Sequence, residues 1–270
     1  LGPEVAPDME TRPSMRGFEI RAKARLAHPL TTPQGAISMS EDAPEAWAHI
    51  REETKPYGLG QENIPGYTGR TSGVPVEEHL ESWLTGQALT FLEHDRDSER
   101  PLFLYLSFDN PHAAFNVPAG YEDLYDIDDI PERPFPDWEN HPDAHVVQGR
   151  RTNEWMHKTP LERRRTTLRY YALCSYVDDM YGRVLRKLEE MGELDNASVI
   201  FTSDHGEMLG DRFHRFSKYS LYEGSIRVPL ILSGCGLPSE RQGTVDHRPA
   251  ELVDVLPTLL DVAGEPVPPS

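Results

Sequence analysis

Asp204 and His205 are the residues of this sequence whose types and position best suit a metal site. They follow the β-branched run Ala197–Thr202, which is typical of a buried strand. Open α/β sheets bind ligands at the carboxyl ends of such strands. A carboxylate beside an imidazole, with Glu207 and Asp211 close by in sequence, offers oxygen and nitrogen ligands to a divalent cation. The alternative is a strand-to-loop turn in which Asp204 caps the following backbone.

His112 comes after a second apolar run, LFLYLSF (Leu102–Phe108), which predicts another strand buried on both faces. Both motifs then end strands of one sheet, so we expect His112 and Asp204–His205 to converge at one edge. Lys218 stands later in the chain, and beside a bound anion it would neutralise charge on a leaving group. The alternatives are a hydrogen-bonded loop histidine and a solvated surface lysine.

Helices are expected to flank these runs, as in an α/β fold. Apolar residues at helical spacing predict a helix that begins at Pro75 and a longer one over Leu161–Met191, with Gly192 as its stop. Another helix is expected over Pro249–Ala263, after the apolar run VPLIL. The stretch Asn116–Pro160 lacks periodicity and is interpreted as a long loop.

The chain is expected to form part of a single domain over residues 1–270, because a chain of this length can bury a sizeable core. Residues 1–74 are interpreted as irregular surface excursions with a short helix around 44–53. The α/β core is expected over residues 75–264, and residues 265–270 form a Pro-rich tail.

Composition excludes several classes of protein. The 27 Lys and Arg residues against 45 Asp and Glu residues give a net charge of -18, which argues against nucleic-acid binding. No apolar run approaches the roughly 20 residues that a membrane span needs. The two cysteines, Cys174 and Cys235, lack the C-x-x-C spacing and are expected to be buried free thiols. The absence of a visible signal peptide favours a cytoplasmic protein, and the sequence does not indicate an oligomeric state.

Four segments, in this order, resemble the sulfatases of the alkaline phosphatase superfamily. They are RPLFLYLSFDNPHAAF (Arg100–Phe115), YVDDMYGRVLRKLEEMGELDNASVIFTSDHGEMLGD (Tyr176–Asp211), KYSLYEGSIRVPLIL (Lys218–Leu232) and ELVDVLPTLLDVAG (Glu251–Gly264). The resemblance covers most of the chain from Pro75 onward. It implies an α/β sandwich of the alkaline phosphatase type, with a mostly parallel sheet between helices and incomplete at both ends.

The resemblance also implies roles for the residues that match the family's motifs. Asp204 and His205 would help bind a divalent metal, calcium in the first place and Mg²⁺ or Mn²⁺ as alternatives, although many relatives have Asn at the second position. His112 and Lys218 would hold the sulfate oxygens and help the leaving group depart. Relatives of this subgroup often have His after the Gly-Asp pair. This chain has Arg there, and His214 two residues later is the candidate to replace it.

The implied reaction is hydrolysis of a sulfate ester of a small molecule or saccharide. In that reaction a hydrated formylglycine attacks sulfur, the metal and His112 stabilise the sulfuryl oxygens, and Lys218 offsets charge on the departing oxygen. The formylglycine arises from a C/S-x-P-S/A-R motif, which this sequence lacks. We therefore expect the nucleophile upstream of Leu1, and no turnover by this chain alone. The alternatives are a phosphonate monoester or phosphodiester hydrolase, and a catalytically silent homologue.

Other polar side chains receive structural or specificity roles. Asp178 and Asp179 flank the apolar face of the long helix and are expected to be solvated or paired structurally. Four residues of the long loop are candidates for substrate contact, because family members vary there. They are Trp138, His141, His145 and Trp155.

Overall fold

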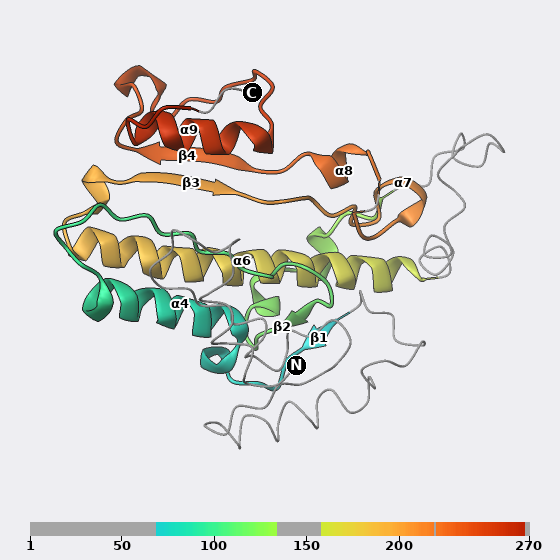
Figure 1. Ribbon diagram of the computed structural model, residues 1–270. Coiled ribbons are helices and arrows are strands. Elements are labelled where there is room, and N and C mark those ends of the chain that lie inside the picture. The colour runs from blue at the N-terminus through green and yellow to red at the C-terminus, as the bar shows by residue number, and fades with distance from the viewer. Residues whose placement is uncertain (1–68, 134–157, 219, 268–270) are drawn as a thin grey trace, which may run out of the picture. The chain divides into compact units, whose positions relative to one another are not determined.

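The computed structural model describes residues 69–133, 158–218 and 220–267 (Figure 1). The helix expected around residues 44–53 and the four loop candidates for substrate contact lie outside the described residues.

The chain divides into two compact units. We call the first the helical unit, and it comprises Leu1–Val184 and Leu209–Phe216. We call the second the strand unit, and it comprises Leu185–Met208 and Ser217–Ser270.

The helix predicted from Pro75 is present in the helical unit. It consists of the 3₁₀ turn η4 (Val76–Glu78), α4 (Leu80–Thr90) and the π-helical turn η5 (Phe91–Asp95). Its burial extends beyond the apolar face, because the polar residues Glu81, Ser82 and Thr85 are buried together with Leu80. A charged side chain inside this packing needs a partner, and the N–H of Asn110 is the partner of Glu81.

The long helix predicted over Leu161–Met191 is confirmed as α6 (Pro160–Glu190). A capping box begins it: Thr159 Oγ1 accepts the N–H of Glu162 at 3.2 Å, and Glu162 Oε2 accepts the N–H of Thr159 at 2.7 Å. The backbone bond from Thr159 is the main reason that the pKa of Glu162 is lowered. At the other end Gly192 adopts φ +71° and its N–H donates to the carbonyl of Glu189 at 2.9 Å, as expected for the stop.

The helix α4 runs beside α6 (Figure 1), and Tyr176 of α6 joins the two in the core of the helical unit. Its ring is fully buried, and its hydroxyl oxygen accepts the N–H of Ser82 at 3.0 Å. The same hydroxyl lies 2.8 Å from Ser82 Oγ, which in turn donates to the carbonyl of Val76 at 2.6 Å. The core cluster around Tyr176 contains Phe115, Val117, Ala172, Leu173, Met180 and Phe216.

Asp179 has the structural role that was expected for it. Its Oδ2 accepts the hydroxyl of Tyr121 at 2.8 Å. Burial, together with this carboxylate, raises the pKa of Tyr121 to about 12. Asp178 is exposed on the same helix.

The run Leu102–Phe108 does not form the predicted buried strand. No described strand pairs with it, and its side chains alternate between half-buried and exposed, with Phe103 61% and Tyr105 71% exposed. Apolar sequence alone does not make a strand, because a strand also needs a hydrogen-bonded neighbour. The pairing described in this unit is parallel and joins β1 (Arg70–Thr71) to β2 (Asn116–Val117).

The predicted strand β3 (Ser198–Thr202) is present in the strand unit, but its five residues are half-buried rather than buried. It lies beside β4 (Leu230–Gly234). They pair in the antiparallel sense, with Ile200 opposite Leu232. This differs from the mostly parallel sheet between helices that was expected. A parallel pair needs a long crossover, usually a helix of several turns, and only short helical turns are described between β3 and β4. Nor is β4 buried on both faces, since Ile231 is 57% exposed.

The helix predicted over Pro249–Ala263 is present but shorter, as the 3₁₀ turn η11 (Leu252–Asp254) and α9 (Val255–Val262). The remaining short helical elements are η6 (Glu122–Leu124), η7 (Ile127–Asp129), η9 (Leu194–Asn196), α7 (Asp211–His214), α8 (Glu223–Ile226) and η10 (Ser239–Arg241). The expected loop from Asn116 to Pro160 therefore contains β2 and two short turns where it is described.

Two further properties bear on the sequence predictions. None of the described helices combines the length and the apolarity that crossing a membrane requires. Both cysteines are free, but Cys174 is exposed and Cys235 is half-buried, so the prediction of buried thiols was wrong. Cys174 follows the buried Leu173 on α6, and neighbouring helix positions point in different directions.

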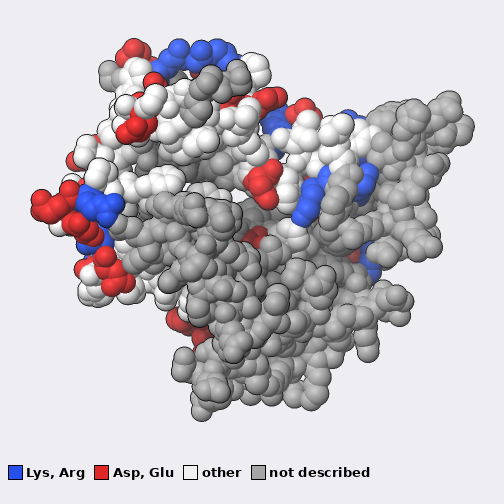
Figure 2. Space-filling view, in the orientation of Figure 1, with Lys and Arg blue, Asp and Glu red and all other residues white. Residues whose placement is uncertain are grey.

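Charges of both signs are mixed on the face shown in Figure 2. The described Lys and Arg side chains there stand in small groups near Asp and Glu. On this face the described residues form no broad basic surface.

Tyr176→Phe in the full-length protein is expected to lower the free energy of unfolding by about 1–3 kcal/mol, because the buried N–H of Ser82 loses its acceptor. Urea denaturation measures this change. Tyr105→Phe is the matched control, since Tyr105 is 71% exposed, and a change below about 0.5 kcal/mol is expected. Equal effects of the two substitutions would contradict the role of Tyr176.

Candidate functional site

Asp204 and His205 lie just past the end of β3, as the sequence predicted. Asp204 Oδ1 accepts the N–H of His205 at 2.9 Å, and Asp204 Oδ2 lies 3.7 Å from His205 Nε2. His205 Nδ1 lies 2.9 Å from the carbonyl oxygen of Gly206, which can only accept a hydrogen bond. In the neutral ring the proton therefore sits on Nδ1 and the lone pair on Nε2, the usual state of a metal-binding histidine.

This Asp204–His205 pair fits part of a divalent metal site. Because Oδ2 and Nε2 are 3.7 Å apart, one ion at the usual ligand distances of about 2.0–2.6 Å can contact both atoms. The side chain of Asp204 is 84% exposed, so its carboxylate is accessible. Within residues 69–133, 158–218 and 220–267, no group of three His, Cys, Asp or Glu residues is arranged to hold a metal. A metal held by this pair would need at least one further ligand.

Glu207 and Asp211, which are close to the pair in sequence, have other partners. Glu207 Oε1 accepts the N–H of Met208 at 3.1 Å and also the N–H of Ser217. Asp211 opens α7, and its Oδ1 accepts the N–H of the next residue at 3.1 Å. Glu207 therefore fixes the backbone immediately before Lys218.

The loop that carries Lys218 is tied to the Asp204–His205 pair within the strand unit. Ser225 provides the connection: its carbonyl accepts the N–H of Gly206 at 2.8 Å, and its hydroxyl donates to the carbonyl of Lys218. No side chain fits at Gly206, because a Cβ there would lie 2.2 Å from the carbonyl oxygen of Gly224. The backbone thus brings Lys218 and the pair onto neighbouring loops.

Backbone strain is concentrated between β3 and β4. Four non-glycine residues adopt the left-handed region there, namely Leu209 (φ 46°), Arg212 (φ 51°), His214 (φ 53°) and Ser217 (φ 84°). Each such conformation costs about 1–3 kcal/mol, and such residues cluster at functional sites. The strain points to a functional role for this segment, which contains His214 and ends next to Lys218.

His112 belongs to the helical unit and is exposed. Its Nδ1 lies 2.6 Å from the carbonyl oxygen of Ala113, so Nδ1 is the donor in this contact. The N–H of Asn110, two residues earlier, is accepted by Glu81 Oε1 at 3.1 Å. Because His112 and the Asp204–His205 pair belong to different units, their convergence stays a prediction.

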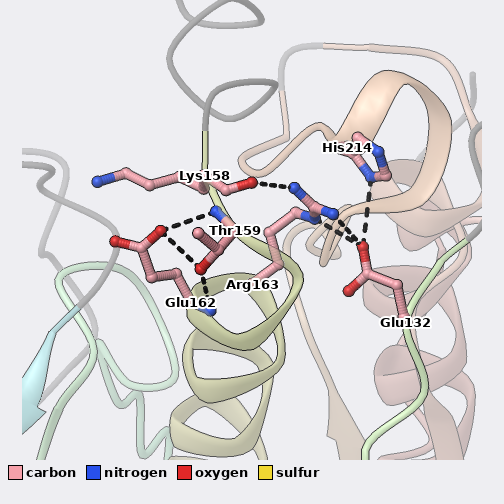
Figure 3. A network of polar contacts seen from close by, with 6 residues as sticks. All are labelled: Glu132, Lys158, Thr159, Glu162, Arg163 and His214. Carbon is pink, nitrogen blue, oxygen red and sulfur yellow. Dashed lines mark hydrogen bonds and ion pairs between the residues drawn. The ribbon is translucent and has the colours of Figure 1, made fainter.

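His214 lies in a polar network at the start of α6 (Figure 3). Arg163 Nε donates to Glu132 Oε1 at 2.8 Å, and its two terminal nitrogens contact the same oxygen and the carbonyl of Lys158. His214 Nδ1 lies 3.9 Å from Glu132 Oε1. The sequence predictions missed Glu132 and Arg163, because Glu132 lies within the irregular stretch and Arg163 is one of several neighbouring polar residues.

The surroundings of His214 favour its neutral form. Burial lowers the pKa of this imidazole, and the positive charge of Arg163 lowers it further, against the opposing effect of Glu132. A shallow hollow beside His214 is also lined by Arg133 and Arg164. A neutral imidazole among guanidinium groups suits contact with an anionic group.

Comparison of the sequence with known proteins identifies the family of this chain. The family model described as Sulfatase matches residues 39–265, which is most of the chain. The chain belongs to the sulfatase family. An arylsulfatase from Clostridium perfringens (strain 13 / Type A) is 36% identical over 208 residues, which cover 76% of this sulfatase chain and 42% of the relative.

Two further relatives extend this result. The multifunctional alkaline phosphatase superfamily protein PehA of Trinickia caryophylli is 33% identical over 77% of this chain and 43% of its own length. The solved phosphonate monoester hydrolase from Silicibacter pomeroyi superposes with a TM-score of 0.63 at 24% identity, over 86% of this chain and 49% of that chain. The α/β fold is therefore shared. The chain spans 42% of the length of the Clostridium perfringens arylsulfatase and 43% of the length of PehA.

The pKa of His214 is expected to lie below 6.5, the value of an unperturbed histidine. Since the folded state disfavours the imidazolium, His214 contributes stability above pH 6.5 that is lost as the pH falls through its folded pKa. Glu132→Gln is expected to lower this pKa further, because the carboxylate of Glu132 raises it. NMR titration of the ¹⁵N-labelled imidazole rings measures both values.

Glu99→Gln is the control for this titration, because Glu99 is exposed and is not among the groups that shift His214. It is expected to leave the titration of His214 unchanged. A midpoint above 6.5 in the unsubstituted protein, or a rise in Glu132→Gln, would show that burial and Arg163 do not control this ring.

Proposed function

We propose that the full-length protein is a sulfuric ester hydrolase that acts on the sulfate ester of a small molecule or saccharide. The observation that carries the proposal is the Asp204–His205 pair, whose carboxylate and imidazole lie 3.7 Å apart on a loop tied through Ser225 to Lys218. Membership of the sulfatase family and the similarity to an arylsulfatase support sulfate as the group that is cleaved.

We propose further that the described α/β elements belong to a sandwich of the alkaline phosphatase type. The TM-score of 0.63 with a solved phosphonate monoester hydrolase supports this placement. In such a fold the loops after the strands meet at one edge of the sheet. His112 would there join the Asp204–His205 pair.

Asp204 and His205 would hold a divalent cation, with calcium as the first candidate and Mg²⁺ or Mn²⁺ as alternatives. Bound there, the cation would act as a Lewis acid toward a sulfuryl oxygen. The contribution of the chain is orientation. The Nδ1–H of His205 donates to Gly206, and this bond holds the ring with its Nε2 lone pair available as a ligand.

His112 and Lys218 would bind the sulfate group. The Nδ1–H of His112 is held by the carbonyl of Ala113 at 2.6 Å, so a protonated ring presents its Nε2–H to an anionic oxygen. The ammonium group of Lys218 would offset the charge that develops on the leaving oxygen. His214, neutral because of burial and Arg163, would accept a hydrogen bond or a proton.

The attacking group in this proposal is a formylglycine from a part of the full-length protein outside these residues. No C/S-x-P-S/A-R motif occurs among the 270 residues. The residues described above bind and orient the ester, and they need this group for turnover.

The full-length protein is expected to hydrolyse 4-nitrophenyl sulfate with a higher kcat/KM than a 4-nitrophenyl phosphonate monoester. His112→Ala and Lys218→Ala should each lower kcat/KM about 100-fold or more, because each removes a group that stabilises charge in the transition state. Lys187→Ala on α6 is the matched control, since Lys187 pairs with Glu190 at 3.9 Å, and no change is expected.

Two results would overturn this proposal in different ways. A higher kcat/KM for the phosphonate monoester would assign the protein to the alternative hydrolase activity. No turnover of either substrate by the full-length protein, with its formylglycine confirmed by mass spectrometry, would support a catalytically silent homologue.

A further inference from the structure

Glu81 is a buried carboxylate on α4 whose partner is the segment that carries His112. It is 1% exposed, and its Oε1 accepts the N–H of Asn110 at 3.1 Å. Among the described residues, no hydrogen-bond partner reaches its buried Oε2. A glutamine would accept the same bond without a buried charge. Stability alone therefore does not account for a glutamate at this position.

We propose that Glu81 is the positioning residue of His112: by holding the N–H of Asn110, it fixes the segment Asp109–His112 and the place at which the imidazole is presented. This inference rests on the proposed function, in which His112 binds the sulfate group. Glu81 acts on His112 through the backbone of this segment, because Glu81 is buried and bonds to Asn110, whereas His112 is exposed.

The helix that carries Glu81 is a firm support. Thr85 Oγ1 donates to the carbonyl of Glu81 at 2.7 Å. The N–H of the next residue, Ser82, donates to the hydroxyl oxygen of Tyr176 at 3.0 Å, and the two hydroxyl oxygens lie 2.8 Å apart. Side chains that orient a site work best on regular elements whose own positions are locked by packing.

The segment is also held at its beginning and by its own turn. Phe108, directly before it, packs edge-on against Tyr181 of α6 with ring centroids 4.8 Å apart. The N–H of His112 donates to the carbonyl of Asp109 at 3.0 Å. Between these contacts, the bond from Asn110 to Glu81 fixes the middle of the segment. Loss of that bond would let the turn shift while its ends stay in place.

The charge of Glu81 changes near neutral pH. Burial raises the pKa of Glu81 to about 7, with a smaller contribution from Asp109, while the hydrogen bonds from Asn110 oppose the rise. Tyr176 is the titratable group that faces Glu81 from α6, and Glu81 contributes to the rise in the pKa of Tyr176. The carboxylate form accepts the N–H of Asn110 more strongly than the acid form. His112 should therefore be held more firmly above pH 7 than below it.

The test compares the full-length protein with Glu81→Gln, which keeps an acceptor for Asn110 but does not titrate. With 4-nitrophenyl sulfate as substrate, the kcat of the unsubstituted protein divided by the kcat of Glu81→Gln is expected to be near 1 well below pH 7. It should rise to about 10 well above pH 7, because small displacements of a catalytic group cost up to about 100-fold. Taking the ratio removes the titration of every group that the two proteins share.

At every pH, Glu81→Ala should lower kcat by a larger factor than it changes KM. At low pH, Glu81→Gln should retain most of the kcat that Glu81→Ala loses. Glu99→Gln, at an exposed position, is the control and should have the pH profile of the unsubstituted protein. If Glu81→Ala does not fold, the pH dependence of kcat in Glu81→Gln and in the unsubstituted protein still tests the role of Glu81.

A second measurement separates this inference from the proposed function. The NMR signal of the Asn110 backbone N–H, which Glu81 Oε1 accepts, is expected to shift with a midpoint near pH 7 in the unsubstituted protein and to lose this step in Glu81→Gln. This readout needs no turnover, so it tests Glu81 even if the sulfatase assay fails. Parallel pH profiles of kcat together with the same step of the Asn110 signal in Glu81→Gln would overturn the inference.

Discussion

Tyr176 fixes α4 against α6, because its buried hydroxyl oxygen accepts the N–H of Ser82 and the two hydroxyl groups are also hydrogen-bonded. Without that hydroxyl the buried N–H of Ser82 would lose its acceptor, which destabilises the folded state. The position of α4 then determines where Glu81 lies, and Glu81 holds the N–H of Asn110. The exposed His112 thus takes its place from a chain of contacts that begins in the core of the helical unit.

The strand unit uses a similar arrangement beside its own candidate side chain. Glu207 accepts the N–H of Ser217, the residue directly before Lys218, as Glu81 accepts an N–H close to His112. Ser217 is held with φ 84°, a conformation that is unfavourable for a non-glycine residue. A carboxylate bound to the backbone can stabilise such a loop where no regular element continues. In both units a glutamate fixes the backbone next to a residue that is proposed to bind sulfate.

The helices could be predicted from the sequence because their signals are local. The apolar spacing along α6 and the Thr159–Glu162 capping box lie within a few residues of each other. The run Leu102–Phe108 and the parallel sheet were predicted less well, since strand pairing depends on distant neighbours. Glu81 was missed for the same reason, since its hydrogen-bond partner Asn110 lies 29 residues later in the chain. The candidate residues themselves came from the resemblance to sulfatases, whereas the contacts that orient them required the structure.

The central proposal is that Asp204 and His205 bind a divalent metal and that His112 and Lys218 bind sulfate. A crystal structure of the full-length protein grown with calcium and sulfate tests it most directly. We expect calcium about 2.3–2.6 Å from a carboxylate oxygen of Asp204, with His205 Nε2 also in its coordination shell. We also expect a sulfate within about 3.2 Å of His112 and Lys218. Calcium bound away from Asp204 and His205, or sulfate out of reach of His112 and Lys218, would show that these residues do not have the proposed roles.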